Sequence, residues 1–126
     1  MKKSRTKTYR KELARQRRKK SIRKKMFGSK IRPRLVVYKG LKNISAQLVD
    51  DMENKVLLGY SSFAKDNKID KTKNKTEQSF EVGLKLGELA LEHNIEKACF
   101  DRNGFKFHGR IRAQKEGAEK AGLKFE

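Results

Sequence analysis

The chain has 126 residues, of which 39% are charged and 35% hydrophobic, and its formal net charge is +19 at pH 7. That length suits one domain with a modest core. The charge exceeds what solubility requires and indicates a polyanionic partner such as nucleic acid, acidic lipid or an acidic protein. A single cysteine excludes an intramolecular disulfide, and no apolar run approaches the ~20 residues of a membrane-spanning helix. No apolar segment follows the basic N-terminus, so we expect no secretory signal and a cytoplasmic protein.

The positive charge is concentrated at the N-terminus. Residues 1–34 contain 17 Lys and Arg and one acid, a formal charge of +16, whereas residues 35–126 carry +3. A segment this charged repels itself, so we expect residues 1–31 to form a basic arm that is partly disordered in the free protein. Polyanion binding is expected to make the arm helical, with Thr8 as candidate N-cap. A solvated charge run and a targeting signal are the alternatives. The arm residues expected to contact RNA are Arg10, Arg15, Arg17, Arg18, Arg23, Lys24 and Lys25.

The body, residues 32–126, opens with strand patterns. Residues 34–39, 44–50 and 56–61 alternate apolar and polar side chains or form short apolar runs bounded by turns. The connecting turns are short, which predicts a three-stranded antiparallel meander. Residues 65–76 are polar, and we expect them to form an exposed loop.

After this loop the hydrophobic period changes to that of a helix. Apolar side chains fall at i, i+4, i+7 and i+8 from Val82, which is the pattern of one helix face. Gly83 and Gly87 lie one turn apart, and each lowers helix propensity, so we interpret them as positions of close packing against the sheet. Asn94 is the candidate residue just beyond the C-terminus of this helix.

The C-terminal quarter predicts one more strand and one more helix. Residues 97–100 form a short apolar run, and a strand reached through a helical crossover usually lies parallel to its neighbour. Residues 101–104 form a turn, and a helix is expected from about residue 109 to residue 121, closed by Gly122. The fold class is therefore α/β: a helical arm followed by a β-β-β-α-β-α sandwich with a mixed sheet.

Several stretches of the body carry a family likeness. Residues 32–39 read Arg-Pro-Arg-Leu-Val-Val-Tyr-Lys, and residues 43–51 read Asn-Ile-Ser-Ala-Gln-Leu-Val-Asp-Asp. Residues 100–111 read Phe-Asp-Arg-Asn-Gly-Phe-Lys-Phe-His-Gly-Arg-Ile, and residues 121–125 read Ala-Gly-Leu-Lys-Phe. In the order and spacing of these stretches, over about 95 residues preceded by a basic arm, the chain resembles the family of bacterial large-subunit ribosomal protein eighteen, which binds 5S rRNA.

The resemblance implies a structural role without catalysis. It implies binding of 5S rRNA, attachment of that RNA to 23S rRNA in the central protuberance, and contact with neighbouring large-subunit ribosomal proteins. It also implies a place in the cytoplasmic ribosome, with no membrane and no small-molecule substrate. The chain departs from the family pattern at residues 39–41, where Arg-Ser-Asn is more common, at Ser45, where an aromatic residue is usual, and at Asn103, where Gly is more common.

Two parts of the body are candidate RNA contacts. Tyr38 lies on the more polar side of the first two strands, where its ring can stack on a base or, alternatively, cover a packed helix. In residues 102–112, glycines let the backbone approach a phosphate, and the following helix offers its positive end. We interpret Phe105 and Phe107 as anchors of this loop rather than stacking partners. The body residues expected to contact RNA are Arg32, Arg34, Tyr38, Lys39, Lys42, Asn43, Gln47, Arg102, Lys106, His108, Gly109, Arg110 and Arg112.

Two other classes of function stay open. A metal-dependent nuclease needs three or four convergent acids, whereas the strand ends offer only Asp50 and Asp101, which turn formation explains. A peripheral membrane protein needs an apolar anchor beside its basic arm. Cys99 lies inside an apolar run and indicates a buried thiol, and with His93 and His108 it falls short of the four ligands of a structural zinc site. We therefore expect no catalytic residue, no metal site and no cofactor.

Overall fold

The computed structural model describes residues 6–62, 69 and 72–126. Within them the chain forms three helices and five strands. The elements are α1 (Lys7–Lys25), β1 (Arg34–Lys39), β2 (Ile44–Asp50), β3 (Lys55–Ser61), α2 (Lys75–Glu92), β4 (Lys97–Asp101), α3 (Arg110–Ala121) and β5 (Lys124–Phe125). The predicted fold class, a helical arm followed by an α/β body, is confirmed.

The strands form one mixed sheet with the order β3-β2-β1-β4-β5. β2 pairs antiparallel with both β1 and β3, so the predicted meander is confirmed. β4 pairs parallel with β1, as the helical crossover predicts. The pairing of β5 with β4 was not predicted, because two residues are too short to show a period of alternation.

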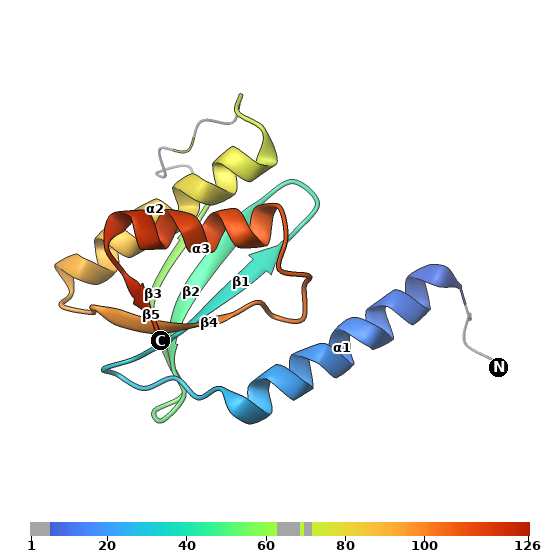
Figure 1. The fold of residues 1–126 in the computed structure, drawn as a ribbon, viewed down its shortest axis with the longest axis horizontal. Coiled ribbons are helices and arrows are strands. Elements are labelled where there is room, and N and C mark those ends of the chain that lie inside the picture. Colours follow the sequence, from blue (N-terminus) through green and yellow to red (C-terminus); the bar gives the residue numbers. More distant parts are fainter. Residues whose placement is uncertain (1–5, 63–68, 70–71) are drawn as a thin grey trace.

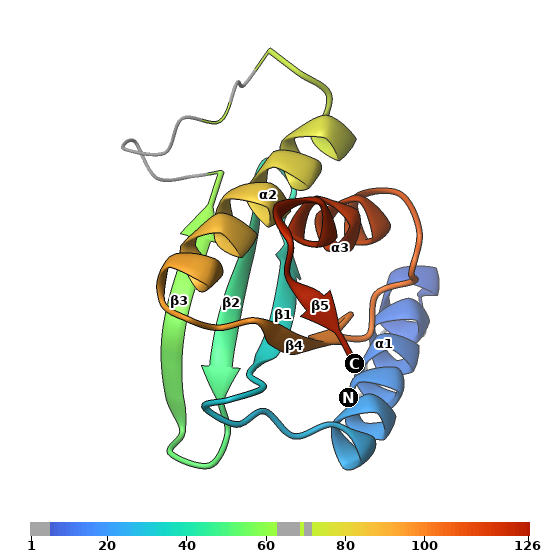
Figure 2. The same ribbon diagram turned by 60° about the vertical axis from the view of Figure 1, so that its left-hand side comes forward.

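α2 and α3 cover one face of the sheet, whereas α1 lies apart from them, alongside the loop that follows β4 (Figures 1 and 2). The core between the sheet and the two helices is apolar. Leu35, Val37 and Leu48 from the sheet and Leu86 from α2 are fully buried in it. This core draws on no residue of α1, which has no buried side chain.

α2 and α3 cross closely at glycines. A Cβ on Gly83 would lie 2.0 Å from the carbonyl oxygen of Gln114, and a Cβ on Gly117 would lie 2.0 Å from that of Phe80. The prediction that Gly83 and Gly87 approach the sheet was wrong, since both lie against α3. The period of one helix identifies close packing but not the packing partner.

Two local predictions were also wrong in part. The N-cap of α1 is Thr6, whose hydroxyl accepts a hydrogen bond from the Tyr9 amide, and not Thr8. The predicted loop 65–76 ends earlier, because Asn74 caps α2 and the helix starts with a polar turn at Lys75. Ile69 within that loop is buried rather than exposed. Residues 65–68 and 70–71 of the predicted loop lie outside the described residues.

The C-termini of α2 and α3 lie where the sequence predicts them. Asn94 adopts a positive φ of 61° directly after the α2 C-cap His93, and Gly122 ends α3 with a φ of 112°. Both positions require the left-handed region that Asn and Gly tolerate best. These two predictions are confirmed.

Candidate nucleic-acid interface

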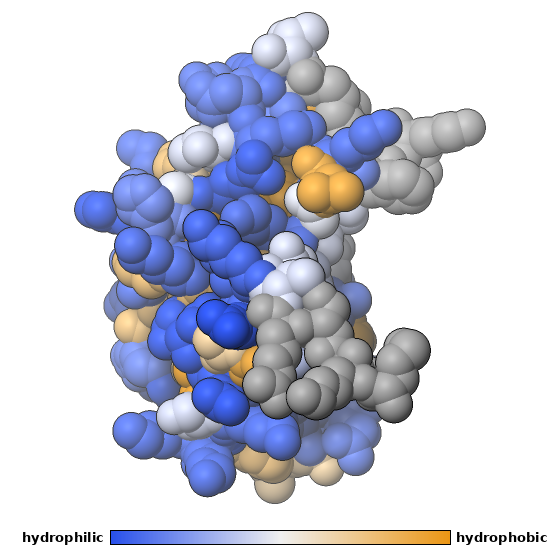
Figure 3. All heavy atoms as spheres, turned by 90° about the vertical axis from the view of Figure 1, so that its right-hand side faces the viewer, coloured by the Kyte–Doolittle hydropathy of each residue, from blue (hydrophilic) through white to orange (hydrophobic). Residues whose placement is uncertain are grey.

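One face of α1 is turned toward the body. The half-buried positions from Arg15 to Met26 are spaced four, three, one and three residues apart, which defines one side of a helix. That side includes Arg15 and Arg23, two of the residues predicted to contact RNA. The other predicted arm residues are exposed; they are Arg10, Arg17, Arg18, Lys24 and Lys25. Figure 3 looks onto the arm side of the molecule, where the described side chains are predominantly hydrophilic.

The middle of the arm packs on the loop after β4. The guanidinium carbon of Arg15 lies 4.0 Å from the centroid of the Phe105 ring, a cation–π contact. Arg18 Nε donates a hydrogen bond of 2.9 Å to the carbonyl oxygen of Gly104. Gly104 has a φ of 77°, and a Cβ there would lie 2.6 Å from the carbonyl oxygen of Arg15. A glycine is therefore required where the arm crosses this loop.

Three predicted RNA-binding segments meet at Phe105. Besides Arg15 of the arm, Lys39 at the end of β1 places its Nζ 5.8 Å from the same ring centroid. Phe105 itself belongs to the predicted 102–112 loop and packs its ring against the edge of the core cluster. One aromatic side chain thus joins the arm, the first turn and the loop into one basic surface.

The end of the arm is fixed to the body by Asp51. Arg34 donates to both carboxylate oxygens of Asp51, at 3.0 and 3.1 Å, and the amide of Gly28 donates to Oδ2 at 2.7 Å. From α1, Arg23 Nη1 lies 3.4 Å from the same oxygen. Burial alone would raise the pKa of the Asp51 carboxyl, but hydrogen bonds from Arg34 and Gly28 outweigh it and hold that pKa below its usual value.

The 102–112 loop offers exposed cations next to a helix start. Lys106, His108 and Arg112 are exposed, and Arg110 is half-buried as the first residue of α3. Gly109 is the N-cap of α3, with a φ of 54°, and makes no side-chain cap hydrogen bond. A Cβ there would meet nothing within 4 Å, so this backbone is open to approach by a phosphate.

The predicted RNA-binding residues on β1 and β2 differ in whether their side chains are available to contact RNA. Tyr38 is 42% exposed at the end of β1, where its ring is open to stacking. It lies opposite Ser45, and Val36 lies opposite Gln47 on the same side of the sheet, as predicted from the alternation. Arg34 is different, because its Nη1 donates at 2.6 Å to Asp101 while its other nitrogens bind Asp51. Its side chain is engaged within the protein.

The other predicted residues lie around the first turn and at neighbouring loop positions. Lys39 and Lys42 are exposed, whereas Arg32 and Asn43 are half-buried. The carbonyl oxygen of Lys42 accepts a hydrogen bond of 2.6 Å from Lys75 Nζ at the start of α2. The first turn is thereby held against α2 while the Lys39 and Lys42 side chains stay at the surface.

Features that resembled a catalytic or metal site have structural explanations. Asp50 Oδ1 accepts from the Met52 amide, and Asp101 Oδ1 accepts from the Asn103 amide, so both close turns as predicted. Cys99 is buried, and burial raises the pKa of its thiol. Among residues 6–62, 69 and 72–126, no three His, Cys, Asp or Glu side chains lie together as metal ligands. No helix in the described part of the chain is both long and apolar enough to cross a membrane.

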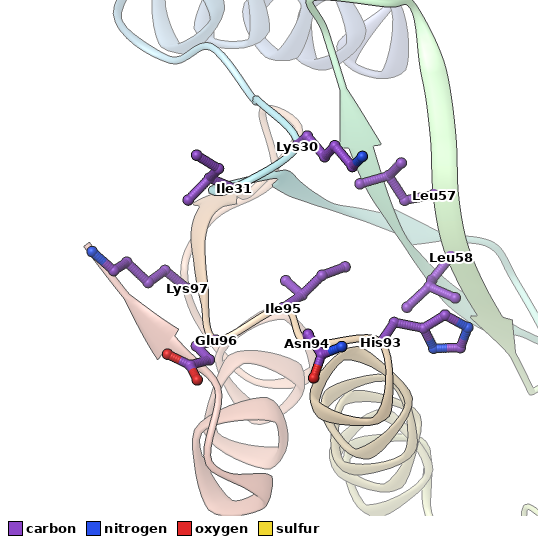
Figure 4. Close-up of a pocket in the computed structure, with 9 residues that line it drawn as sticks. All are labelled: Lys30, Ile31, Leu57, Leu58, His93, Asn94, Ile95, Glu96 and Lys97. Carbon is purple, nitrogen blue, oxygen red and sulfur yellow. The ribbon is translucent and has the colours of Figure 1, made fainter.

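A cavity of ≈ 450 Å³ lies on another part of the molecule, between β3, the segment before β1 and the segment joining α2 to β4 (Figure 4). Leu57, Leu58 and Ile95 point into it, and His93 at its edge has Nδ1 only 2.9 Å from the Leu89 carbonyl oxygen. It is lined by none of the predicted RNA-binding residues. Its apolar surface does not suit a phosphate group.

Sequence reasoning missed the residues that assemble this surface. No role in the site was predicted for Asp51, although its carboxylate binds three donors from separate segments. Phe105 was interpreted as a loop anchor, and the contacts with Arg15 and Lys39 add the joining role. The run of basic residues gives no signal for either, because both contacts link positions far apart in sequence.

The comparisons with known proteins point to one family. The family model of ribosomal L18 of archaea, bacteria, mitochondria and chloroplasts matches residues 9–125. The large ribosomal subunit protein uL18 of Prosthecochloris aestuarii is 50% identical over 98 residues, covering 78% of this chain and 82% of the relative. The uL18 proteins of Myxococcus xanthus and Thermotoga petrophila are 47% and 45% identical, covering 89% and 86% of this chain and 95% and 90% of the relatives.

These relatives are named as ribosomal proteins and not as enzymes. Their names confirm the predicted functional class, a structural protein of the ribosome, and the predicted ribosomal location. The match runs through the arm from residue 9 as well as through the body. The chain therefore belongs to the L18 family of large-subunit ribosomal proteins.

Proposed function

We propose that this chain binds 5S rRNA and helps attach it to 23S rRNA in the central protuberance of the large subunit. The observation that carries the proposal is the meeting of three basic segments at Phe105, with Arg15 and Lys39 both against its ring. A surface joined in this way follows an RNA backbone better than separate charges do. Family membership supports ribosomal RNA and ribosomal proteins as the partners.

The outer face of α1 supplies the largest part of the phosphate contacts in this proposal. Arg17 and Lys24 are exposed there, on the side of the helix away from the body. Contacts of this kind give affinity and orientation without base specificity. Lys106 and Arg110 extend the same surface across the loop and the start of α3.

Selection of 5S rRNA is assigned to the body. The exposed Tyr38 ring offers a platform for an unpaired base, and the Lys42 side chain lies at the surface of the adjacent turn. We assign Arg34 a supporting role, because its guanidinium is bound by Asp51 and Asp101. Contacts with 23S rRNA and with neighbouring proteins then hold the 5S complex in the subunit.

The arm and the body are proposed as separate units of function. The boundary predicted from the sequence lies between residues 31 and 32. The contacts of Gly28 favour an earlier boundary, because its amide and its carbonyl oxygen both form hydrogen bonds with Asp51, at 2.7 and 2.9 Å. We propose that the arm ends at Phe27. Ordering of the arm by RNA stays a prediction.

Lys106→Ala and Arg110→Ala are each expected to weaken 5S rRNA binding by about 1–3 kcal/mol, the cost of one charge-assisted hydrogen bond. Neither side chain is part of the core cluster, so melting temperatures should change little. Filter binding with purified 5S rRNA and thermal unfolding measure the two quantities.

Lys120→Ala is the matched control for these variants, since Lys120 is exposed near the other end of α3 and its loss changes the net charge equally. It should bind 5S rRNA nearly as wild type. Equal weakening by all three variants would show a general charge effect and contradict a specific surface. A melting temperature that falls in step with affinity would make Lys106 and Arg110 structural residues.

A further inference from the structure

We propose that Asp51 is a positioning residue for RNA binding, which fixes the direction in which α1 leaves the body. The proposal rests on the proposed function, because the arm must contact RNA for its direction to matter. Asp51 itself carries the charge that repels a phosphate. Its contribution would therefore act through Arg23 and Gly28 rather than through contact with RNA.

The contacts of Asp51 come from both sides of the junction. From the body, Arg34 binds both of its oxygens; from the arm, Arg23 reaches both, at 3.4 and 3.5 Å. Arg23 Nη1 also donates at 2.7 Å to the carbonyl oxygen of Met26, the C-cap of α1. One guanidinium thus closes the end of the helix and holds it to the carboxylate.

The backbone at the junction leaves little room for another path. Gly28 exchanges two hydrogen bonds with Asp51, one through the Asp51 carboxylate and one through the Asp51 amide. A Cβ on Gly28 would lie 2.4 Å from the Val49 carbonyl oxygen and 2.6 Å from the Arg34 nitrogen. The chain therefore passes directly against the end of β2 before it enters β1.

A helix needs two separated contacts to have a fixed direction. The first is the contact of Arg15 and Arg18 with Phe105 and Gly104. The second is the contact of Arg23 with Asp51. It lies farther along α1, which rises about 1.5 Å per residue. With the second contact removed, α1 can pivot about the first, and fewer molecules present the arm and the loop as one surface.

Because Asp51 is negatively charged, positioning and simple electrostatics predict opposite changes in RNA affinity when it is neutralised. Asp51→Asn raises the net charge by one, which by itself should tighten binding to RNA. Loss of positioning should instead weaken binding, because only the fraction of molecules with the arm in place is competent. Glu53→Gln is the matched control, since Glu53 is exposed in the same turn and its neutralisation changes the net charge equally.

The first measurement is the affinity of the full-length wild type, Asp51→Asn and Glu53→Gln for purified 5S rRNA. If the competent fraction falls to about one tenth, Asp51→Asn binds about tenfold more weakly, whereas Glu53→Gln binds no more weakly than wild type. Equal affinities of the two variants would overturn the positioning role while leaving the proposed function intact. Failure of the wild type itself to bind would overturn both.

The second measurement needs no RNA. Spin labels on Lys11→Cys in α1 and Glu119→Cys in α3, both exposed positions, report the distance between arm and body. The native Cys99 is buried and should not take a label. We expect a narrow distance distribution in wild type and Glu53→Gln and a broader one in Asp51→Asn. The same distribution in all three would overturn the proposal.

Arg23→Lys decides the question if Asp51→Asn fails to fold. This change keeps the charge and the Arg34–Asp51 pair but removes the fork that reaches Met26 and Asp51 together. The distance distribution should again broaden and 5S rRNA binding should weaken. An unchanged distribution in Arg23→Lys would overturn the proposal.

Discussion

Removal of residues 1–26 is expected to lower the affinity for 5S rRNA by orders of magnitude at low salt and to flatten its dependence on salt. The deletion removes 14 basic residues and one acid. Each lost phosphate contact lowers the slope of log affinity against log salt by roughly 0.7–0.9. We expect several contacts to be lost and not all 14, because Arg15, Arg18 and Arg23 also bind the body.

The truncated chain should stay folded. It begins at Phe27 and so keeps the two hydrogen bonds between Gly28 and Asp51, and the core cluster draws no residue from α1. Thermal unfolding checks this directly. A titration series at several salt concentrations gives the slope.

The control for the truncation is a full-length protein in which Arg17, Lys24 and Lys25 are changed to Gln. These side chains are exposed, so α1 should keep its contacts with Phe105 and Asp51 while its outer face loses charge. Its slope should lie between those of the wild type and the truncated chain. An unchanged slope in the truncated chain would mean that the arm does not contact the RNA.

Gly83→Ala is expected to destabilise the body by about 2 kcal/mol and to lower its melting temperature by about 10 °C. Alanine is the better helix former by about 1 kcal/mol, which taken alone would stabilise α2. The added Cβ, however, would lie 2.0 Å from the Gln114 carbonyl oxygen and 3.1 Å from the Ala118 nitrogen. Both are backbone atoms of α3, so the two helices must move apart and the core beneath them loosens.

Gly59→Ala is the control for this effect. A Cβ at that position in β3 would meet Gln47 Cγ at 3.6 Å, an ordinary van der Waals contact. Its melting temperature should stay within a few degrees of wild type. A Gly83→Ala protein as stable as wild type would mean that the helices do not cross as closely as described.

Features set by neighbours in the sequence were predictable. Alternation located β2 to the residue, because a strand with one buried face must place Ile44, Ala46 and Leu48 on the same side, whereas β1 was located by its apolar run between turns. Asn94 and Gly122 marked helix ends because few residues tolerate a positive φ. The parallel pairing of β4 was predictable because a strand reached through a helical crossover usually lies parallel to its neighbour.

Features set by residues distant in sequence were not predictable. The ion pairs of Asp51 join residues 17 to 28 positions apart, and no local pattern marks them. Gly83 signalled a close approach but not its partner, since a helix period defines a face and not what covers it. The charge of the arm indicated RNA, whereas the contact of Arg15 with Phe105, which joins arm and loop, required the fold.

The most direct test of the central claim is selection of 5S rRNA from total bacterial RNA by the purified full-length protein at near-physiological salt. We expect 5S rRNA to be enriched over transfer RNA of comparable abundance and to shift as a one-to-one complex. High salt should reduce all binding, since phosphate contacts supply most of the affinity. Equal retention of transfer RNA and 5S rRNA under competition would contradict the account, because the surface around Phe105 would then bind RNA without selecting it.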